Sequence, residues 1–226
     1  MKKEDFINKN IYTFLKGKIG KFEFTKDNLM NIKSISINAF DLSDNFISNN
    51  LGDLNYFENL EEISLVNFII NRPNIKIIEN LKNLDIFEFN NCDFKDNLHI
   101  YGRCLKLNNC NNIFRISFEN FENIIIKNCD IDNLKLDKVQ NLQILNCHIK
   151  NVPLLSFDIK KLDLELMKID TKIELLISKL INCNIKLIKC QFENDEQKKR
   201  MQSLKNVKII KNTILTDNGI YEEEDL

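Results

Sequence analysis

The sequence predicts a repeat fold of the α/β class, an α/β solenoid in which each coil adds one strand to a parallel sheet. Three observations support this prediction. A short apolar pattern returns several times between Leu84 and Ile149, cysteine recurs at one position of that pattern, and apolar residues alternate within each copy. Repeats of roughly 20 residues are typical of stacked coils, because no single coil can bury its apolar face alone.

Length and composition allow a sizeable core but indicate no electrostatic partner. The chain has 226 residues, 43% of them hydrophobic, and its 32 Lys and Arg nearly balance 33 Asp and Glu, for a net charge of -1. Such a balance does not drive the whole molecule onto nucleic acid or anionic lipid. Because the chain has only 5 Gly and 2 Pro, we expect Asn to form most of the turns.

Cysteine usage indicates a reducing compartment. The seven cysteines are an odd number and occupy repeat positions instead of a compact framework, which predicts free thiols. Lys2 and Lys3 have no apolar run behind them, and no stretch approaches the ~18 apolar residues of a membrane span. We therefore expect a cytoplasmic protein that does not contact membranes.

Residues 1–29 fit the pattern poorly and are predicted to form an N-terminal cap. Helical spacing predicts a short amphipathic helix, whereas the segment after Gly20 alternates loosely like a strand. The helical positions are Phe6, Ile7, Ile11, Phe14 and Leu15, and the alternating ones are Ile19, Phe22 and Phe24. A cap is expected because the terminal coil of a stack would otherwise expose its core.

The repeats are predicted to occupy residues 30–215, followed by an acidic C-terminal tail, 216–226, that has no core pattern and is expected to fray. The clearest copy reads Leu84-x-x-Phe87-x-Phe89-x-x-Cys92-x-Phe94, and a looser one has Gly102 at its opening apolar position. The expected equivalent strand residues are Ile37, Leu65, Phe89, Leu107, Ile126, Ile144, Leu164, Leu187 and Ile209, with separations of 28, 24, 18, 19, 18, 20, 23 and 22 residues.

The register of the repeat near residue 180 has two alternatives. Aligning the repeat near residue 180 on Cys183 gives separations of 16 and 29, so we prefer Cys190. A turn of helix is also expected between Asn50 and Asn59, within the longest separation.

The pattern resembles the leucine-rich repeat family, whose motif is L-x-x-L-x-L-x-x-N/C-x-L. The N/C position holds Asn212 and five of the seven cysteines, namely Cys92, Cys110, Cys129, Cys147 and Cys190. Phe40, Phe68 and Met167 depart from the motif at that position. The resemblance implies a right-handed coil whose x-L-x-L segments form a concave parallel sheet of about nine strands. The convex side is expected to be mostly irregular, because 18-residue repeats leave room only for irregular or extended segments.

The candidate binding residues flank the inward-pointing strand residues, because successive side chains of a strand point to opposite faces. We expect them on the concave face, where they form a polar set of mixed charge without large aromatic anchors. The candidate partner-binding residues are Glu88, Asn90, Lys106, Asn108, Lys127, Gln143, Asp163, Glu165, Lys186 and Lys208. The same alternation places Ser34, Ser36, Asn38, Glu62, Ser64, Asn123, Asn141 and Lys161 beside them.

No motif predicts an enzyme, a cofactor, a metal site or a small-molecule substrate. There is no C-x-x-C pair, G-x-S-x-G or Gly-rich phosphate loop, and the recurring cysteines are better explained as buried core positions. A Cys-His nucleophile would have to use His99 or His148, and only Cys147-His148 are adjacent. We interpret both histidines as non-catalytic.

Two partner hypotheses follow. The first is another protein bound through the strand face or an edge; one such role is an inhibitor or immunity factor that blocks an enzyme. The second is nucleic acid or a ribonucleoprotein, bound through a C-terminal cluster of cations that could equally be a solvated surface. These cations are Lys198, Lys199, Arg200, Lys205, Lys208 and Lys211.

Overall fold

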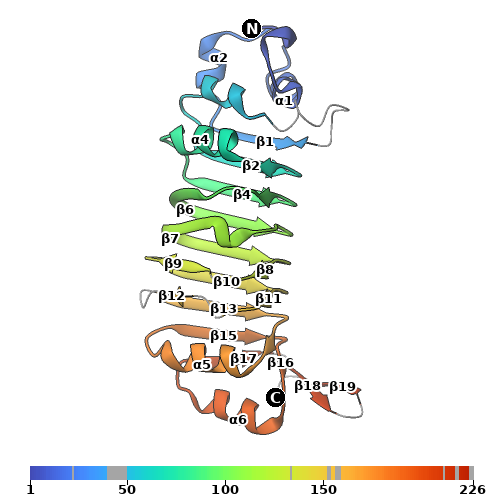
Figure 1. Cartoon of the computed structure of the whole chain (residues 1–226), viewed down its shortest axis with the longest axis vertical. Helices are drawn as coiled ribbons and strands as arrows, with labels where there is room; N and C mark the ends of the chain where they lie inside the picture. The colour runs from blue at the N-terminus through green and yellow to red at the C-terminus, as the bar shows by residue number, and fades with distance from the viewer. Residues whose placement is uncertain are drawn as a thin grey trace. The chain divides into compact units, whose positions relative to one another are not determined.

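The computed structural model describes residues 1–21, 23–39, 50–132, 134–151, 154–155, 159–210, 212–216 and 219–223. The chain folds as two compact units, Met1–Ser117 and Phe118–Leu226. In each unit parallel strands and helices combine, so the predicted α/β class with a parallel sheet is confirmed. All nine predicted strands exist, four in the first unit and five in the second, counting β7 with the second (Figure 1).

The first unit is built on four parallel strands in the order β1-β2-β4-β6. Their bounds are β1 Ser34–Asn38, β2 Glu62–Val66, β4 Ile86–Asn90 and β6 Leu98–Asn108. Two short strands, β3 Ile69–Ile70 and β5 Asp93–Phe94, pair in parallel beyond the turns that end β2 and β4. The remaining elements are η1 Lys3–Asp5, α1 Lys9–Ile19, α2 Lys26–Met30, η3 Gly52–Tyr56, α4 Arg72–Asn80 and η4 Ile113–Arg115.

The second unit repeats this plan with strands in the order β7-β10-β13-β15-β17. Their bounds are β7 Ile116–Lys127, β10 Asn141–Leu145, β13 Lys161–Glu165, β15 Asn184–Ile188 and β17 Val207–Ile210. Short strands follow the turns: β8 Asp130–Ile131, β9 Lys135–Asp137, β11 His148–Ile149, β12 Leu154–Leu155, β14 Lys168–Ile169, β16 Gln191–Phe192 and β18 Asn212–Thr216. The helices are α5 Thr171–Lys179 and α6 Asp195–Ser203, and the last strand is β19 Gly219–Glu223.

The predicted register is confirmed inside both units. Leu65 pairs with Ile37 on one side and with Phe89 on the other, and Phe89 pairs with Leu107. In the second unit Leu164 pairs with Ile144 and with Leu187, which supports the choice of Cys190 over Cys183. Because equivalent apolar residues stack directly, Leu65, Phe89 and Leu187 are fully buried.

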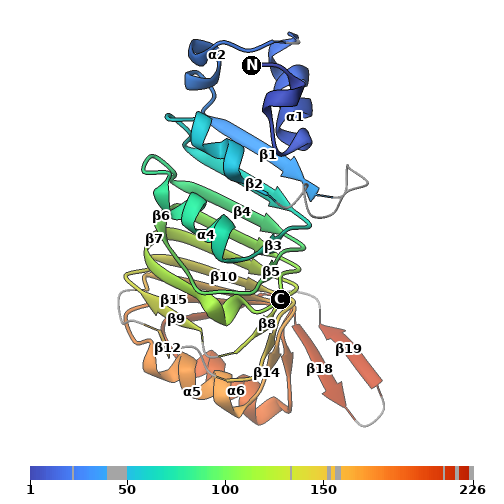
Figure 2. The same ribbon diagram turned by 45° about the horizontal axis from the view of Figure 1, so that its top comes forward.

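The distance between repeats decides whether the segment that returns to the next strand is helical. The 24-, 23- and 22-residue repeats contain α4, α5 and α6, whereas the 18- and 20-residue repeats inside the units return through extended segments. In the first unit α4 lies beside η3 and β6 (Figure 2). The expectation of a mostly irregular convex side is therefore corrected: three of the return segments form regular helices, because only the longer ones have room for two turns.

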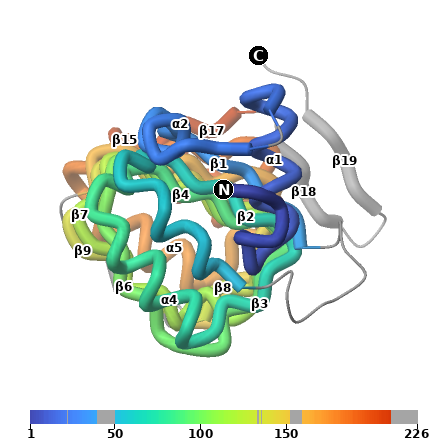
Figure 3. Tube along the Cα trace, turned by 90° about the horizontal axis from the view of Figure 1, so that it is seen from above, coloured from blue at the N-terminus to red at the C-terminus, as the bar shows by residue number. Residues whose placement is uncertain are grey.

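The N-terminal segment forms the predicted helix but not the predicted strand. Asn8 caps α1 by accepting a hydrogen bond from the Asn10 N–H, and Ile11 and Leu15 are fully buried. Ile19 ends α1, and Phe24 directly precedes the capping residue Thr25 of α2, so the strand predicted there is wrong for these two positions; Phe22 lies outside the described residues. The helix α1 packs against β1, with α2 at the same end of the first unit (Figure 3).

The expected helical turn between Asn50 and Asn59 is confirmed as the 3-10 helix η3. Its residue Asp53 is buried and accepts a hydrogen bond of 2.6 Å from the Asn8 N–H just before α1. Burial raises the pKa of Asp53 above its ordinary value. This contact ties η3 to the start of α1.

Gly102 occupies an apolar position of the motif because the backbone leaves no room for a side chain there. A Cβ atom at Gly102 would stand 2.7 Å from the carbonyl oxygen of Asp85. That same carbonyl accepts hydrogen bonds from the Arg103 and Cys104 N–H groups, at 2.8 and 3.1 Å. The close approach is what joins β6 to the preceding strand.

The C-terminal residues were expected to fray, but residues 219–223 form a strand. Tyr221 pairs with Ile214 in an antiparallel hairpin between β18 and β19. Parallel pairing also reaches this end, since Phe192 of β16 pairs with Ile214. The Asn212 side chain, predicted at the N/C position, lies outside the described side chains.

The strands β2, β4, β6, β7, β10, β13 and β15 each turn through one residue with a positive φ, placed directly before the N/C position. In the first unit these residues are Asn67, Asn91 and Asn109, with φ of 63°, 53° and 53°. Their amides form a ladder, in which the Asn91 Nδ2 donates to Asn67 Oδ1 and the Asn109 Nδ2 donates to Asn91 Oδ1, at 3.2 and 2.6 Å. In the second unit Asn146 Nδ2 donates to Asn128 Oδ1 at 2.8 Å, but the next rung has Leu166 at φ 52°.

Replacing Leu166 by Asn should stabilise the protein. The left-handed conformation disfavours residues with a Cβ atom, and Asn tolerates it best after Gly. Leu166 is 50% exposed, so little burial is lost. We expect the free energy of unfolding to rise by about 1 kcal/mol, seen as a higher urea midpoint with an unchanged m value.

Leu175→Asn is the matched control, because Leu175 is 56% exposed but lies within α5. Asn is a poorer helix former than Leu, so this variant should be slightly less stable than the wild type. A Leu166→Asn protein that is no more stable than Leu175→Asn would contradict this account of the turn.

Candidate functional site

The predicted binding residues lie on the strand face opposite the core. In the first unit, cross-strand pairing aligns Ser36, Ser64, Glu88 and Lys106 in one row. In the second unit it aligns Ile125, Gln143, Asp163, Lys186 and Lys208. A second row lies two residues further along the strands of each unit. It pairs Asn90 with Asn108 in the first unit, and it aligns Lys127, Leu145 and Glu165 on successive strands of the second. The structure thus brings the predicted residues together within each unit.

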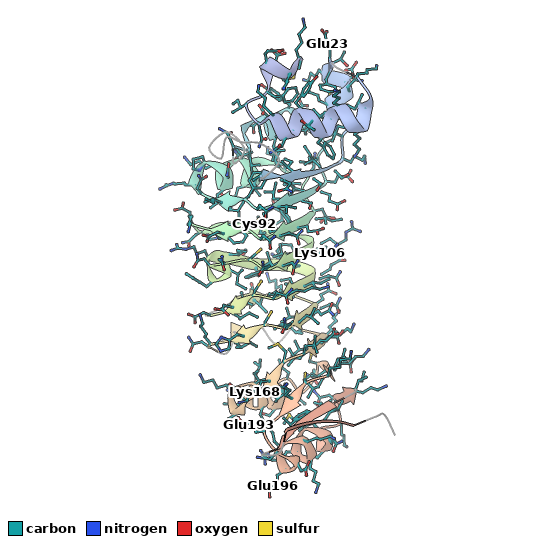
Figure 4. The ribbon with its side chains drawn as sticks, turned by 90° about the vertical axis from the view of Figure 1, so that its right-hand side faces the viewer. Glu23, Cys92, Lys106, Lys168, Glu193 and Glu196 are labelled. Carbon is teal, nitrogen blue, oxygen red and sulfur yellow. The ribbon has the colours of Figure 1, made fainter. Side chains whose placement is uncertain are left out.

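Polar contacts fix the charged side chains of the first unit. The Asn90 Nδ2 donates to Glu88 Oε1 at 2.9 Å, and the Lys106 Nζ lies 3.9 Å from the other oxygen of Glu88. Figure 4 shows Lys106 pointing away from the ribbon, whereas Cys92 of the same unit lies inside it. This face therefore presents an exposed cation next to a positioned carboxylate.

Asp163 is the most constrained charged residue of the second unit. Its Oδ2 receives an ion pair from Lys161 Nζ at 2.9 Å, and its side chain is only 13% exposed. Among the described residues, its Oδ1 is buried without a hydrogen-bond partner. A buried carboxylate oxygen without a donor is costly, so the Lys161 ion pair is the described contact that stabilises this charge.

Apolar residues on the same face were missed by the sequence-based list. They share the alternation of the chosen polar residues, and each is half-buried: Val66, Ile86, Ile125, Leu145, Ile188 and Ile210. The alternation alone could have identified them, but only polar side chains were selected. Their presence makes the face amphipathic, as protein interfaces commonly are.

A hollow of about 590 Å³ lies in the first unit at the start of the strands, and charged pairs line it. Lys33 Nζ lies 2.6 Å from Glu61 Oε1, and Arg103 Nε lies 3.1 Å from Asp85 Oδ2. The Arg103 N–H also donates to Asp85 Oδ1 at 2.7 Å. Since both cations are already paired, the hollow is a polar surface feature and not a pocket suited to a free anion.

The recurring cysteines are buried; the pKa values of Cys110, Cys147 and Cys190 are raised, whereas the hydrogen bond with Cys110 lowers the pKa of Cys92. The Cys92 thiol donates to the Leu65 carbonyl and the Cys190 thiol to the Leu164 carbonyl, each at 3.3 Å, and in both cases the acceptor belongs to the preceding strand. Burial raises the pKa of Cys147 to about 12 and the pKa of Cys190 to about 11. The hydrogen bond with Cys92, followed by burial, raises the pKa of Cys110 as well. A thiol that stays protonated at neutral pH is a poor nucleophile.

Neither histidine forms a catalytic pair with a cysteine in the described part of the chain. His148 lies in β11, and its Nδ1 is 3.7 Å from Asp130 Oδ1, on the exposed side of the strand and not toward the buried Cys147. His99 lies in β6 with an exposed side chain, and its backbone N–H donates a hydrogen bond to Glu79 Oε1. Within the described residues no three His, Cys, Asp or Glu side chains are grouped to hold a metal ion.

The C-terminal cations do not act as one cluster. Arg200 in α6 pairs with Glu174 in α5 at 2.7 Å, and Lys211 lies outside the described residues. Lys198 and Lys199 share α6 with Arg200, whereas Lys208 lies on β17 beside Lys186 of β15. The hydrogen bond from Arg200 lowers the pKa of Glu174, and the same contact raises the pKa of Arg200.

A scan against protein-family models and a search of curated proteins both found no match to this chain. In the helices that the structure describes, none combines the length and apolar character needed to cross a membrane.

Thiol labelling should separate buried core cysteines from reactive ones. At pH 8 in the native protein, we expect iodoacetamide to modify Cys104 first, since it is the one half-exposed cysteine of the seven. Cys147, Cys183 and Cys190 should react at least tenfold more slowly than in urea, because burial raises their pKa values to about 12, 11 and 11. Mass spectrometry of tryptic peptides measures each rate. Rapid native labelling of Cys147 would instead restore the Cys-His hypothesis.

The Glu174–Arg200 pair should make stability depend on pH in the acidic range. The pKa of Glu174 is lowered in the folded state, so its contribution is complete above its ordinary value of 4.5 and disappears as the pH falls through the lower folded value. Glu174→Gln should therefore reduce stability at pH 7, and the difference from the wild type should shrink toward pH 3. Urea unfolding at each pH measures it.

Glu193→Gln is the matched control, because Glu193 has an exposed side chain just before α6, and it should leave stability at pH 7 unchanged. A difference between Glu174→Gln and the wild type that stays constant from pH 7 to pH 3 would argue against the ion pair.

Proposed function

We propose that the chain is a non-catalytic protein-binding module of the leucine-rich-repeat type, in which a solenoid presents its strand face to another protein. The supporting observation is the set of in-register rows that place charged and apolar side chains side by side on neighbouring strands, such as Lys127, Leu145 and Glu165. Rigid strands that hold such rows need little ordering on binding, which favours affinity.

The turn chemistry supports the assignment to leucine-rich repeats. A buried Cys at the N/C position donates to the carbonyl of the preceding strand, and a left-handed residue precedes it in repeat after repeat. Each thiol bonds a carbonyl inside the preceding strand, so the contact connects each turn to its neighbour.

The chemistry of the face indicates a protein partner. Ile188 and Ile210 are half-buried, and the lysines Lys186 and Lys208 lie two residues before them on the same strands. A protein surface can supply apolar contact and hydrogen-bond acceptors together. Blocking an enzyme, as an inhibitor or immunity factor does, is one function that such a surface could perform in the cytoplasm.

Charge reversal on the face should abolish partner binding. The triple variant Asp163→Lys, Glu165→Lys, Lys186→Glu changes charges within the rows of the second unit. Quantitative pull-down from the native cell should lose, by at least tenfold, a protein that the wild type captures.

The matched control reverses charges of the same sign on return segments: Asp137→Lys, Glu193→Lys and Lys179→Glu, all at exposed positions. It should capture the same protein as the wild type. Equal capture by both triple variants would contradict binding through the strand face.

A second candidate is a nucleic-acid or ribonucleoprotein binder, favoured by the neighbouring cations Lys186 and Lys208. Phosphate binding would weaken steeply as salt rises from 50 to 200 mM, roughly by 10³-fold if six contacts form. Purified protein that shows no shift of RNA or DNA at low salt would exclude this candidate.

A further inference from the structure

The last strand of the second unit has an open edge, unlike the first strand of the first unit. The sheet ends at β17, which pairs with β15 alone among the described strands. The bonds from the Ile185 N–H to the Asn206 carbonyl and from the Lys189 N–H to the Ile210 carbonyl show which backbone groups face β15. Because a parallel ladder uses alternate residues, the N–H and carbonyl of Ile209 point away from β15.

The side chains of β17 are also less covered than those of its neighbour. Val207 and Ile209 are half-buried, whereas the residues that pair with them, Ile185 and Leu187, are 1% and 0% exposed. The end strand thus leaves core-type side chains half-covered, although α6 contacts it, and the N–H and carbonyl of Ile209 have no strand partner among the described residues.

The opposite situation holds at β1. Its core residues Ile35 and Ile37 are each 2% exposed, because α1 packs against the strand. Side chains of α1 also bond its carbonyls: Asn10 Nδ2 donates to Asn38 O at 2.7 Å, and Lys18 Nζ donates to Ser34 O at 3.2 Å. Natural proteins usually cover such edges, so a half-apolar one that is protected by a lysine alone indicates an interaction surface.

We propose that the edge of β17 binds an extended, acidic segment of a partner protein by adding a strand to the sheet. Strand addition uses the main chain for affinity and alternate side chains for specificity. Lys208 points to the same face as Lys186, and Lys205 is exposed just before the strand, so the specificity is for acidic side chains at alternate positions. A second copy of this chain fits less well, because pairing two β17 edges would bring Lys208 close to its own equivalent.

This proposal rests on the proposed protein-binding function and assigns it a second contact site. The probe is the peptide acetyl-Gly-Glu-Val-Glu-Val-Glu-Gly-amide, with its Glu→Lys counterpart as the control, added to the full-length ¹⁵N-labelled protein. The acidic peptide should shift the Ile209 amide resonance and slow its hydrogen exchange at least tenfold, whereas the lysine peptide should do neither. Lys208→Glu should weaken acidic-peptide binding at least tenfold, and Lys172→Glu, on the exposed surface of α5, should leave it unchanged.

Three outcomes would overturn the proposal: no binding at millimolar peptide, equal binding of both peptides, or shifts confined to other strands. Concentration-dependent dimers that Lys208→Glu changes, seen by sedimentation, would overturn it in favour of self-association. These results are separate from the strand-face test, since the triple variant at Asp163, Glu165 and Lys186 leaves Lys208 and the β17 main chain intact. If that variant loses its partner and the peptide does not bind, the edge proposal fails alone.

Discussion

Residue-for-residue pairing between neighbouring parallel strands is the constraint on which the other features depend. Pairing Leu65 with Phe89 places their neighbours Ser64 and Glu88 on the opposite face. A slip of one residue would exchange the two faces and move charged side chains into the core. The same register brings the Cys92 thiol to the Leu65 carbonyl and aligns the Asn67 and Asn91 amides. The core, the turns and the candidate binding face are therefore consequences of one alignment.

That alignment could be predicted from the sequence because it depends on the spacing of apolar residues within each repeat. The apolar residues that pair are the strongest signal of the chain, and even the ambiguous repeat near residue 180 was placed correctly, with Leu187 opposite Leu164. The list of candidate residues followed from alternation, and the structure places these residues on the strand face opposite the core. It was incomplete, because half-buried residues such as Leu145 and Ile188 look like core residues in sequence. Only the exposed fraction of each side chain in the structure distinguishes these half-buried face residues from core residues.

The remaining differences arise where the motif gives no instruction. Alternation from Ile19 to Phe24 was taken for a strand, but the segment ends α1 and leads into α2, since the capping residue Thr25 starts a new helix. No apolar periodicity in the sequence predicts the hairpin between β18 and β19. In the structure, pairing of β18 with β16 extends the parallel ladder before the chain reverses into β19. Gly102 departs from the apolar motif because a Cβ atom there would stand 2.7 Å from the Asp85 carbonyl oxygen.

The first strand of the first unit and the last strand of the second unit each leave one edge to be covered, and the two edges are treated differently. At β1, polar side chains of α1 bond the strand carbonyls and the core stays covered, so that edge is closed to other chains. At β17, half-buried Val207 and Ile209 leave both apolar surface and main-chain groups accessible. An accessible edge promotes aggregation unless charge restricts what can pair with it, and Lys208 in the centre of β17 imposes such a restriction. The same lysine that disfavours self-pairing selects an acidic strand, so protection and specificity have one physical origin.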